Sequence, residues 1–408
     1  MPEESLQPEY VKNFRCIGSQ CEQTCCAGWG IYVDKATYKK YRAQPSLRQA
    51  AKDLIEINPA ARDNFEFAMV RMQGNRCAFL TPENLCKIQQ RHGEEYLSKT
   101  CQRYPRALTR MAGKIQKALL LSCPEAARMV VLGSELLPSE KPLYSWAFAS
   151  ESSHRAETSS NEMMRSLRAM ALDVLRDRSY ALWQRLFLVG NLCRRVREPF
   201  NRQSRGMVQE LCSQYATIIS EGQLRSSLNG IPWRPAPQVE LVQGLLQRRF
   251  QLGQPENGFS SRVAHFLQII HAESGALQPD SVQRYSDACE QRGAAFEQAF
   301  PLFMENYLLN YVIQTGFPAL HGGGGVGERT DPLVSFVVLM LHYRLLQSLM
   351  IGEAAWHGAA FSAAHAVQMV YTFARGLEHN LAFSDELRRT GQRPELQTSD
   401  GMAMVLRN

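Results

Sequence analysis

Eight cysteines near the N-terminus are the residues of this sequence whose type and spacing most clearly indicate chemistry. They are Cys16, Cys21, Cys25, Cys26, Cys77, Cys86, Cys101 and Cys123. The rest of the 408-residue chain contains three more, at positions 193, 212 and 289. Thiolates are soft ligands that suit zinc and iron–sulfur clusters, and three or four must converge on either centre. The sequence therefore predicts a metal-binding head formed by these eight cysteines.

The adjacent pair Cys25–Cys26 narrows the kind of centre. Neighbouring side chains diverge along most backbones, so closing both thiolates on one tetrahedral ion would strain the chain, and so would a disulfide between them. Two adjacent thiolates fit better on two irons of a cluster, on two metals, or with one member spare. The pair thus favours a cluster over a plain zinc site, but a purely structural metal that folds the head stays open. The spacing does not tell which four of the eight cysteines would bind iron.

Basic residues are concentrated in the same region. Between Lys87 and Ser122 the sequence has eight basic residues and two acidic ones, so this segment carries 8 − 2 = +6 of a total formal charge of +7. The basic ones are Lys87, Arg91, Lys99, Arg103, Arg106, Arg110, Lys114 and Lys117. Nearby cations would offset the negative charge of a thiolate-bound cluster. A solvated basic helix face is the alternative. No nucleic-acid-binding module accompanies the charge, so we expect no nucleic-acid partner.

The composition, with 45% hydrophobic and 21% charged residues, is that of a globular protein. We predict a mainly α fold, with an irregular cysteine-rich head over residues 1–135 followed by a multi-helix body over residues 161–408. Short strands are expected at 29–33 and 65–71 within the head. Two prolines and a Ser/Glu-rich stretch mark residues 136–160 as a linker.

Apolar residues at helical spacing predict the helices of the body. Ser159 and Glu162 form a candidate capping box before the first of them. The predicted helices cover about 163–175, 182–196, 205–220, 239–251, 260–272, 281–296, 301–314, 332–350 and 361–376. Residues 230–237 contain three prolines and predict a connection.

The most apolar run, 334–351, contains His342, Arg344 and Gln347, which favours a buried helix over a membrane span. The first residues, Met-Pro-Glu-Glu, lack the basic and apolar regions of a secretory signal. We therefore expect a cytoplasmic protein with no membrane partner, in which clustered cysteines stay reduced.

The cysteine pattern resembles a known family of cysteine-rich proteins described as zinc- or iron-chelating, and within it the flagellin lysine N-methylases. The segments that carry the resemblance are Asn13–Gly18, Cys25–Ile31, Cys77–Leu80, Cys86, Cys101–Pro105 and, in the helical body, Glu305–Tyr311. The resemblance implies methyl transfer from S-adenosylmethionine to lysine ε-amines of flagellin, and a [4Fe–4S] cluster in the head. It extends to the cysteines as metal ligands, but it transfers no catalytic base and no cofactor-binding residue.

One departure from other cluster enzymes concerns the cysteine spacing. Enzymes that cleave S-adenosylmethionine to a radical usually hold their cluster with C-x3-C-x2-C, whereas here Cys21-x3-Cys25 is followed at once by Cys26. A cluster would therefore be held differently, and the sequence does not separate polar from radical transfer. Two other functions stay open: a zinc-binding module that recruits a partner without catalysis, and an electron-transfer protein.

The sequence also lacks a conventional cofactor cradle. Its glycine-rich run, 321–327, follows a helical pattern rather than a strand, and we interpret it as a flexible connection. Presenting a neutral lysine amine at pH 7 costs roughly 4.6 kcal/mol, so a base or a desolvated site is needed. Candidate groups are Tyr32, Asp34, Tyr104, Glu305 and Tyr307, each interpreted first as structural. The histidines include no H-x3-H pair, and we interpret His357 as a packed or surface side chain.

Overall fold

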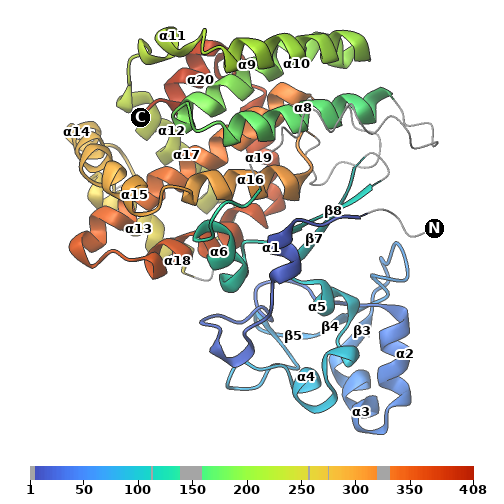
Figure 1. Ribbon diagram of the computed structural model, residues 1–408. Coiled ribbons are helices and arrows are strands. Elements are labelled where there is room, and N and C mark those ends of the chain that lie inside the picture. The colour runs from blue at the N-terminus through green and yellow to red at the C-terminus, as the bar shows by residue number, and fades with distance from the viewer. Residues whose placement is uncertain (1–4, 112–113, 138–158, 256–257, 274, 319–330) are drawn as a thin grey trace. The chain divides into compact units, whose positions relative to one another are not determined.

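The computed structural model describes residues 5–111, 114–137, 159–255, 258–273, 275–318 and 331–408. These residues form two compact units, and each is described by itself. The cysteine-rich unit comprises Phe14–Ala107 and Cys123–Ala126, and the helical unit comprises Met1–Asn13, Leu108–Ser122 and Ala127–Asn408 (Figure 1). The predicted fold class, mainly α with an irregular cysteine-rich head, is confirmed. The predicted linker 136–160 and the glycine-rich run fall largely or wholly outside the described residues.

Short elements make up the cysteine-rich unit. They are η1 (Gly18–Gln20), β2 (Tyr32–Val33), α2 (Lys35–Ala43), α3 (Pro45–Leu54), β3 (Ile55–Ile57), β4 (Ala68–Val70), β5 (Met72–Gln73), β6 (Arg76–Cys77), α4 (Lys87–His92), η2 (Glu94–Tyr96) and α5 (Lys99–Arg103). The strands predicted at 29–33 and 65–71 are present as β2 and β4. They are shorter than predicted and pair antiparallel, with Val33 opposite Ala68. Strand β3 adds to the other edge of β4.

Asp34 fixes the start of α2 and ties it to α5. Its carboxylate accepts hydrogen bonds from the Thr37 backbone N–H and hydroxyl, and from the Lys99 backbone N–H at 3.1 Å. Burial alone would raise the pKa of Asp34, but these hydrogen bonds and the charge of Lys99 together lower it. Asp34 is therefore a helix cap that also holds the first turn of α5, the helix that contains Cys101.

The helical unit begins with β1 (Ser5–Leu6) and α1 (Glu9–Asn13), and β1 lies parallel to β8 (Lys114–Leu119), the partner of β7 (Arg106–Met111). The helices that follow are α6 (Pro124–Val131), α8 (Ser159–Arg176), α9 (Leu182–Asn201), α10 (Arg205–Ser220), α11 (Arg225–Asn229), α12 (Pro235–Gln251), α13 (Phe259–Ile269), α14 (Ser281–Ala288), α15 (Ala294–Ala299), α16 (Phe303–Thr315), α17 (Pro332–His357), α18 (Ala363–Phe373), α19 (Leu381–Gly391) and α20 (Ser399–Leu406). Short turns η3 (Cys289–Gly293), η4 (Gly358–Ala360), η5 (Ala374–Glu378) and η6 (Pro394–Gln397) connect some of them.

The apolar periodicity locates most of these helices, and α10 has the predicted bounds. Two predictions at helix ends differ from the structure. Helix α8 already includes Ser159, so Ser159 is its first residue rather than its cap. Helix α12 begins at Pro235, inside the predicted connection, because proline is well suited to the first turn of a helix. Between α14 and α15 the helix widens into the π-turn η3.

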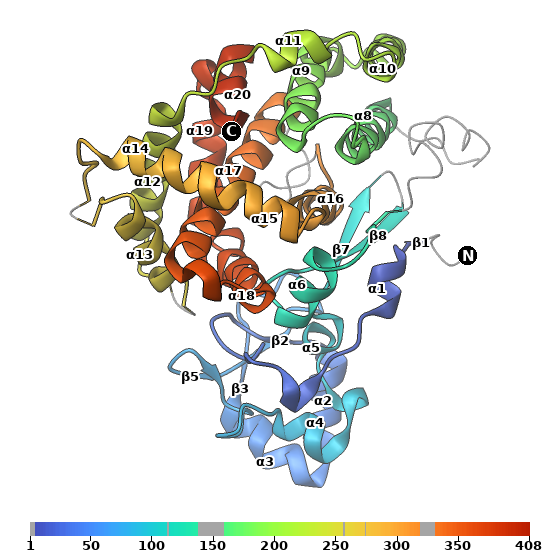
Figure 2. The same cartoon turned by 60° about the vertical axis from the view of Figure 1, so that its left-hand side comes forward.

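Helix α17 runs through the core of the helical unit, packed against α9, α13 and α19 (Figure 2). It is long and apolar enough to meet the criteria for a membrane span, but 94% of that apolar window is buried inside the protein. Its polar side chains have buried partners. Arg344 donates to the backbone oxygens of Val405 and Leu406, and His342 contacts the Tyr311 hydroxyl at 3.2 Å. The prediction of a buried helix at 334–351 is confirmed.

Polar residues of α16 connect distant parts of the helical unit. The Asn310 side chain accepts a hydrogen bond from Tyr10 at 2.9 Å and donates one to the Leu119 carbonyl at 2.9 Å. Glu305, with a side chain 2% exposed, pairs with Arg185 at 2.6 Å and Arg178 at 2.7 Å. A buried carboxylate requires such partners, because an unpaired buried charge is strongly destabilising. Helix α16 therefore holds α1, β8 and the start of α9 in place.

We expect the Glu305→Gln substitution to lower the free energy of unfolding by about 3 kcal/mol, since it leaves the buried Arg185 without its charged partner. The matched control is Glu198→Gln, which removes an exposed carboxylate paired with Arg202 and should change that free energy by less than about 1 kcal/mol. Urea unfolding followed by circular dichroism measures both. Equal, small effects of the two substitutions would contradict the role given to Glu305.

Candidate metal centre

All eight N-terminal cysteines belong to the cysteine-rich unit, and none forms a disulfide. Cys77 and Cys123 are buried, Cys16 and Cys25 are exposed, and the remaining four are partly buried. A metal can reach the exposed thiols of such a set. The buried thiols would then help to shield the bound metal from solvent. The arrangement is therefore suited to holding a metal centre rather than to stapling the chain.

Backbone pairing brings the Cys25–Cys26 loop to Cys77. The Cys77 N–H donates to the Cys26 carbonyl at 2.8 Å, and the Gly28 N–H donates to the Asn75 carbonyl at 2.8 Å. Gly28 has a φ of +82°, which a residue with a side chain adopts only with strain. This glycine lets the loop turn immediately after Cys26 and run along β6.

A tight hairpin brings Cys86 back to the same place. The Thr81 N–H bonds to the Leu85 carbonyl at 2.8 Å, and Leu80 forms an isolated antiparallel bridge with Cys86. Cys101 arrives from α5, whose cap Ser98 accepts a hydrogen bond from the Cys101 N–H at 3.4 Å. Cys77 belongs to an apolar cluster that also contains Ile31, Val33, Tyr41, Phe79 and Ile88, and Cys26, Cys86 and Cys101 pack against it. Three chain segments thus deliver four cysteines to one apolar cluster.

The thiols influence one another's pKa values. Burial, followed by the influence of Cys86 and Cys25, raises the pKa of Cys77 to about 11, and burial with the same neighbours raises the pKa of Cys101 to about 12. Burial raises the pKa of Cys123 to about 12, with smaller contributions from Cys21 and Cys25. A hydrogen bond with Cys25, then burial, raises the pKa of Cys26 above its ordinary value.

Cys25 is the thiol common to these interactions, and it also contributes to the raised pKa of Cys21. The Cys25–Cys26 pair therefore stands between two sets of thiols. Cys26 lies with Cys77, Cys86 and Cys101 at the apolar cluster, and Cys25 also approaches Cys21 and Cys123. The hydrogen bond between the two side chains shows that they lie side by side, so the expectation that adjacent thiols diverge is wrong for this pair.

The spacing of the thiols bears on what they can bind. A zinc ion with Zn–S distances of about 2.3 Å would need its sulfur atoms about 3.8 Å apart in a tetrahedron. Among the described residues, the group of His, Cys, Asp and Glu whose ligand atoms all lie within 4.8 Å of one another contains no cysteine. The thiols among the described residues are therefore not arranged as three ligands of one tetrahedral ion.

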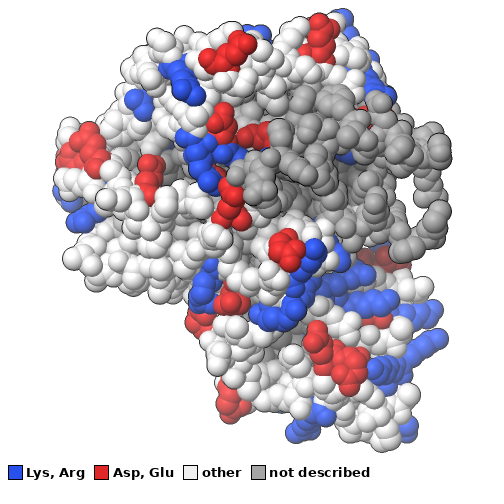
Figure 3. All heavy atoms as spheres, viewed as in Figure 1, with Lys and Arg blue, Asp and Glu red and all other residues white. Residues whose placement is uncertain are grey.

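Cationic side chains lie within the same unit. The guanidinium of Arg106 lies 5.2 Å from the centre of the Phe14 ring and donates to the Phe14 carbonyl, and that of Arg103 lies 5.0 Å from the Phe65 ring centre. These contacts do not neutralise the charge of either arginine. Lysines and arginines gather at the lower right of the surface view, where Figure 1 shows α2 (Figure 3). A positive field of this kind would favour an anionic thiolate-bound centre.

The five candidates for catalysis have structural partners or places. Asp34 caps α2, Glu305 pairs with two arginines, and Tyr32 lies in β2. Tyr104 packs against Trp29, whose indole N–H donates to the Cys25 carbonyl at 2.8 Å. The hydroxyl of Tyr307 donates to Glu378 at 2.9 Å, and burial raises the pKa of that carboxyl to about 7. The contacts give each of these side chains a role in the fold, and we assign none of them as the catalytic base.

Sequence reasoning missed a second group of ligand-type side chains, His265, Glu353 and His357, in the helical unit. Glu353 and His357 lie four residues apart on α17, a spacing that places both on one helix face. A search for Glu-x3-His as well as His-x3-His would have found this half. His265 is 88 residues from Glu353 along the chain, and no local pattern connects the two.

Comparison with known proteins identifies the family. The family model described as the FliB lysine N-methylase C-terminal domain matches residues 168–405, which is more than half of the chain and lies entirely in the helical unit. The chain belongs to the FliB lysine N-methylase family. The resemblance stated from the cysteine pattern is thereby confirmed. No solved structure matches the chain.

Relatives named as methylases align with nearly the whole chain. The Lysine-N-methylase of Salmonella choleraesuis (strain SC-B67) is 23% identical over 411 residues, covering 98% of this chain and 97% of the relative. The Lysine-N-methylase of Salmonella typhimurium (strain LT2) has the same identity and coverage. The Flagellar biosynthetic protein FliU of Salmonella muenchen is 33% identical over 129 residues, covering 31% of this chain and 75% of that protein. The chain is thus a full-length homologue of lysine N-methylases.

We expect the double substitution Cys77→Ser, Cys101→Ser to remove most of the iron or zinc that the purified protein contains, because both thiols lie at the apolar cluster where four cysteines gather. Elemental analysis by mass spectrometry after anaerobic purification measures this. The matched control is Cys193→Ser, Cys212→Ser, which changes two buried cysteines of the helical unit and should leave the metal content unchanged. A Cys77, Cys101 variant with full metal content and native circular dichroism would show that the metal is held elsewhere.

Proposed function

We propose that this chain transfers methyl groups from S-adenosylmethionine to the ε-amines of lysines on flagellin, in the cytoplasm before flagellin is exported. We further propose that the activity depends on a [4Fe–4S] cluster bound by cysteines of the N-terminal unit. The proposal of methyl transfer rests on sequence similarity to lysine N-methylases. The proposal of a cluster rests on the cysteines that gather in the N-terminal unit. They can therefore be tested separately.

Full-length similarity to proteins named Lysine-N-methylase is the observation that supports methyl transfer most directly. The alignment includes both the helical unit and the cysteine-rich unit, so the chain has the whole architecture that those relatives have. The relative named as a flagellar biosynthetic protein supports flagellin as the substrate. A protein-lysine methylase requires S-adenosylmethionine as its methyl donor. We therefore include this donor in the proposed reaction.

The sheets of the described residues are small, and the parallel pair β1–β8 has no crossover helix of the dinucleotide-binding kind. The described residues therefore contain no sheet of the doubly wound type. When bound, a [4Fe–4S] cluster supplies an iron on which the amino and carboxylate groups of S-adenosylmethionine can be held. Its ligands would come from Cys26, Cys77, Cys86 and Cys101, which share one apolar cluster with Cys25 beside them; three of these thiolates would bind the cluster when one iron is left open to S-adenosylmethionine.

The reaction also requires a proton to leave the substrate. A lysine ammonium must lose its proton before its nitrogen can form a bond to the methyl carbon, and the carbon–sulfur bond of the donor then breaks. The products are methyl-lysine, S-adenosylhomocysteine and the released proton. The chain must lower the cost of deprotonation, roughly 4.6 kcal/mol at pH 7, by desolvating the amine or by supplying a base.

We expect the anaerobically reconstituted chain to increase the intact mass of purified flagellin in steps of one methylene when S-adenosylmethionine is present. The Cys25→Ala, Cys26→Ala variant should lose the increase, because it removes the thiols that stand between the two sets of cysteines. Cys193→Ala is the matched control and should keep full activity, since Cys193 is buried in the helical unit.

Each outcome of this experiment bears on one of the two proposals. If the protein contains its metal and still does not methylate flagellin, the enzymatic proposal is contradicted. That result would favour a module that folds around a metal and recruits a partner. If a variant that lacks iron methylates flagellin normally, the enzymatic proposal stands. The proposal that the activity depends on a cluster is then contradicted. A zinc-loaded chain with full activity would have the same meaning.

A further inference from the structure

The second group of ligand-type side chains lies where α13 meets the end of α17, away from the cysteines in the chain. His265 comes from α13, and Glu353 and His357 come from the last turns of α17. Gly352 allows the two helices to approach closely, since a Cβ atom at this position would lie 3.0 Å from the Cα of Phe266. This close approach brings His265, which precedes Phe266, beside Glu353, which follows Gly352.

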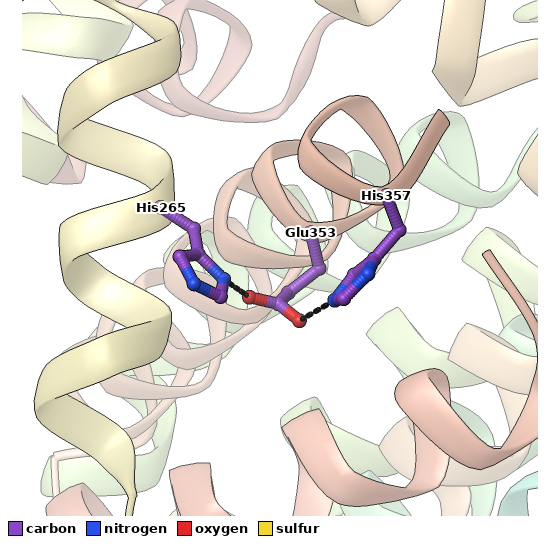
Figure 4. A group of neighbouring side chains, drawn as sticks. All are labelled: His265, Glu353 and His357. Carbon is purple, nitrogen blue, oxygen red and sulfur yellow. Dashed lines mark hydrogen bonds and ion pairs between the residues drawn. The ribbon is translucent and has the colours of Figure 1, made fainter. Parts of the chain in front are cut away.

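The three side chains point toward one another (Figure 4). Nδ1 of His265 lies 2.5 Å from Oε1 of Glu353, and Nε2 of His357 lies 3.4 Å from Oε2 of the same carboxylate. All three ligand atoms lie within 4.8 Å of one another. Ligand atoms about 2.05 Å from a tetrahedral zinc ion are about 3.3 Å apart, so the His357–Glu353 distance already has the required length and His265 needs only a small outward movement.

The burial of the group is that of a metal site with one open side. The Glu353 side chain is fully buried, whereas the imidazoles of His265 and His357 are 19% and 23% exposed. Nε2 of His357 is buried, and apart from its 3.4 Å ion-pair contact with Glu353 it has no hydrogen-bond partner among the described atoms. A buried ring nitrogen without a hydrogen bond is costly, and a bound cation would satisfy it. This nitrogen is an observation independent of the clustering itself.

The surroundings hold the three ligands in orientation. The Trp356 ring stacks on His265 at 4.4 Å between centroids, and the His365 ring stacks on His357 at 3.9 Å. Arg262 donates to Oε2 of Glu353 at 2.6 Å, which fixes the carboxylate and offsets its charge. Ordered partners of this kind are typical of the outer shell of metal sites. Arg262 and His357 approach the same oxygen, Oε2, while His265 approaches Oε1, so an ion placed between the two imidazoles would meet both oxygens of the carboxylate.

We propose that His265, Glu353 and His357 bind a divalent first-row transition-metal ion, with Zn²⁺ as the reference ion and water at the remaining position. Two imidazoles and one carboxylate form a ligand set found in zinc proteins, and it has no sulfur. This α13–α17 site therefore differs in chemistry from the cysteines. A bound ion would join α13 to the C-terminal end of α17.

Zinc binding to the full-length, cluster-reconstituted chain tests the proposal, because occupied cysteines take up less added zinc. We expect equilibrium dialysis to show one zinc ion per chain whose dissociation constant rises at least about tenfold in His265→Gln and in His357→Gln. His271→Gln is the matched control and should bind as the wild type does. His271 is a partly exposed histidine of the same unit that pairs with Asp280 at 3.0 Å.

X-ray absorption at the zinc edge of the wild-type chain gives an answer that does not depend on the folding of variants. A shell of nitrogen and oxygen neighbours at about 2.0–2.1 Å supports the site, whereas sulfur neighbours alone at about 2.3 Å would overturn it. Identical zinc affinity in all four proteins would overturn it as well, and would leave His265 and Glu353 as a metal-free hydrogen-bonded pair. Neither measurement depends on methyl transfer, so failure here does not bear on the proposed function.

Discussion

The hydrogen bond from the Cys77 amide to the Cys26 carbonyl is the contact on which the cysteine-rich unit depends. It joins two segments that the sequence separates widely, and it places the Cys25–Cys26 pair at the junction. The two thiols of the pair are hydrogen-bonded to each other; Cys26 packs against the apolar cluster, and Cys25 influences Cys77 and Cys101 as well as Cys21 and Cys123. Two further cysteines lie at the same junction. Cys86 reaches it through its hairpin, and Cys101 reaches it from a capped helix.

The helical unit solves a different physical problem, which is to bury polar side chains without leaving them unsatisfied. Arg344 of α17 reaches the last carbonyls of α20, where a helix end needs donors. Asn310 of α16 uses both ends of its amide at β8. Such contacts require a defined geometry on both sides, so they fix how the elements pack more narrowly than apolar contacts alone. The packing of the helical unit is therefore fixed by polar as well as apolar contacts.

Sequence reasoning located the helices well because apolar periodicity is a local signal, and the bounds of α10 show its accuracy. It placed strands β2 and β4 but made them too long, since strand length is decided by a pairing partner elsewhere in the chain. It identified the eight cysteines from their density, but it could not divide them. That division follows from the Cys26–Cys77 pairing and the Leu80–Cys86 bridge, which are tertiary contacts. The His265–Glu353 contact was missed for the same reason.

The proposed activity depends above all on an inorganic cluster bound by the gathered cysteines. Native mass spectrometry of the chain, purified without oxygen, tests for this cluster. We expect a folded species heavier than the bare chain by four irons and four sulfides, and loss of that added mass after Cys77 and Cys101 are replaced. A folded chain whose added mass equals zinc ions alone, or one that carries no added mass, would contradict it.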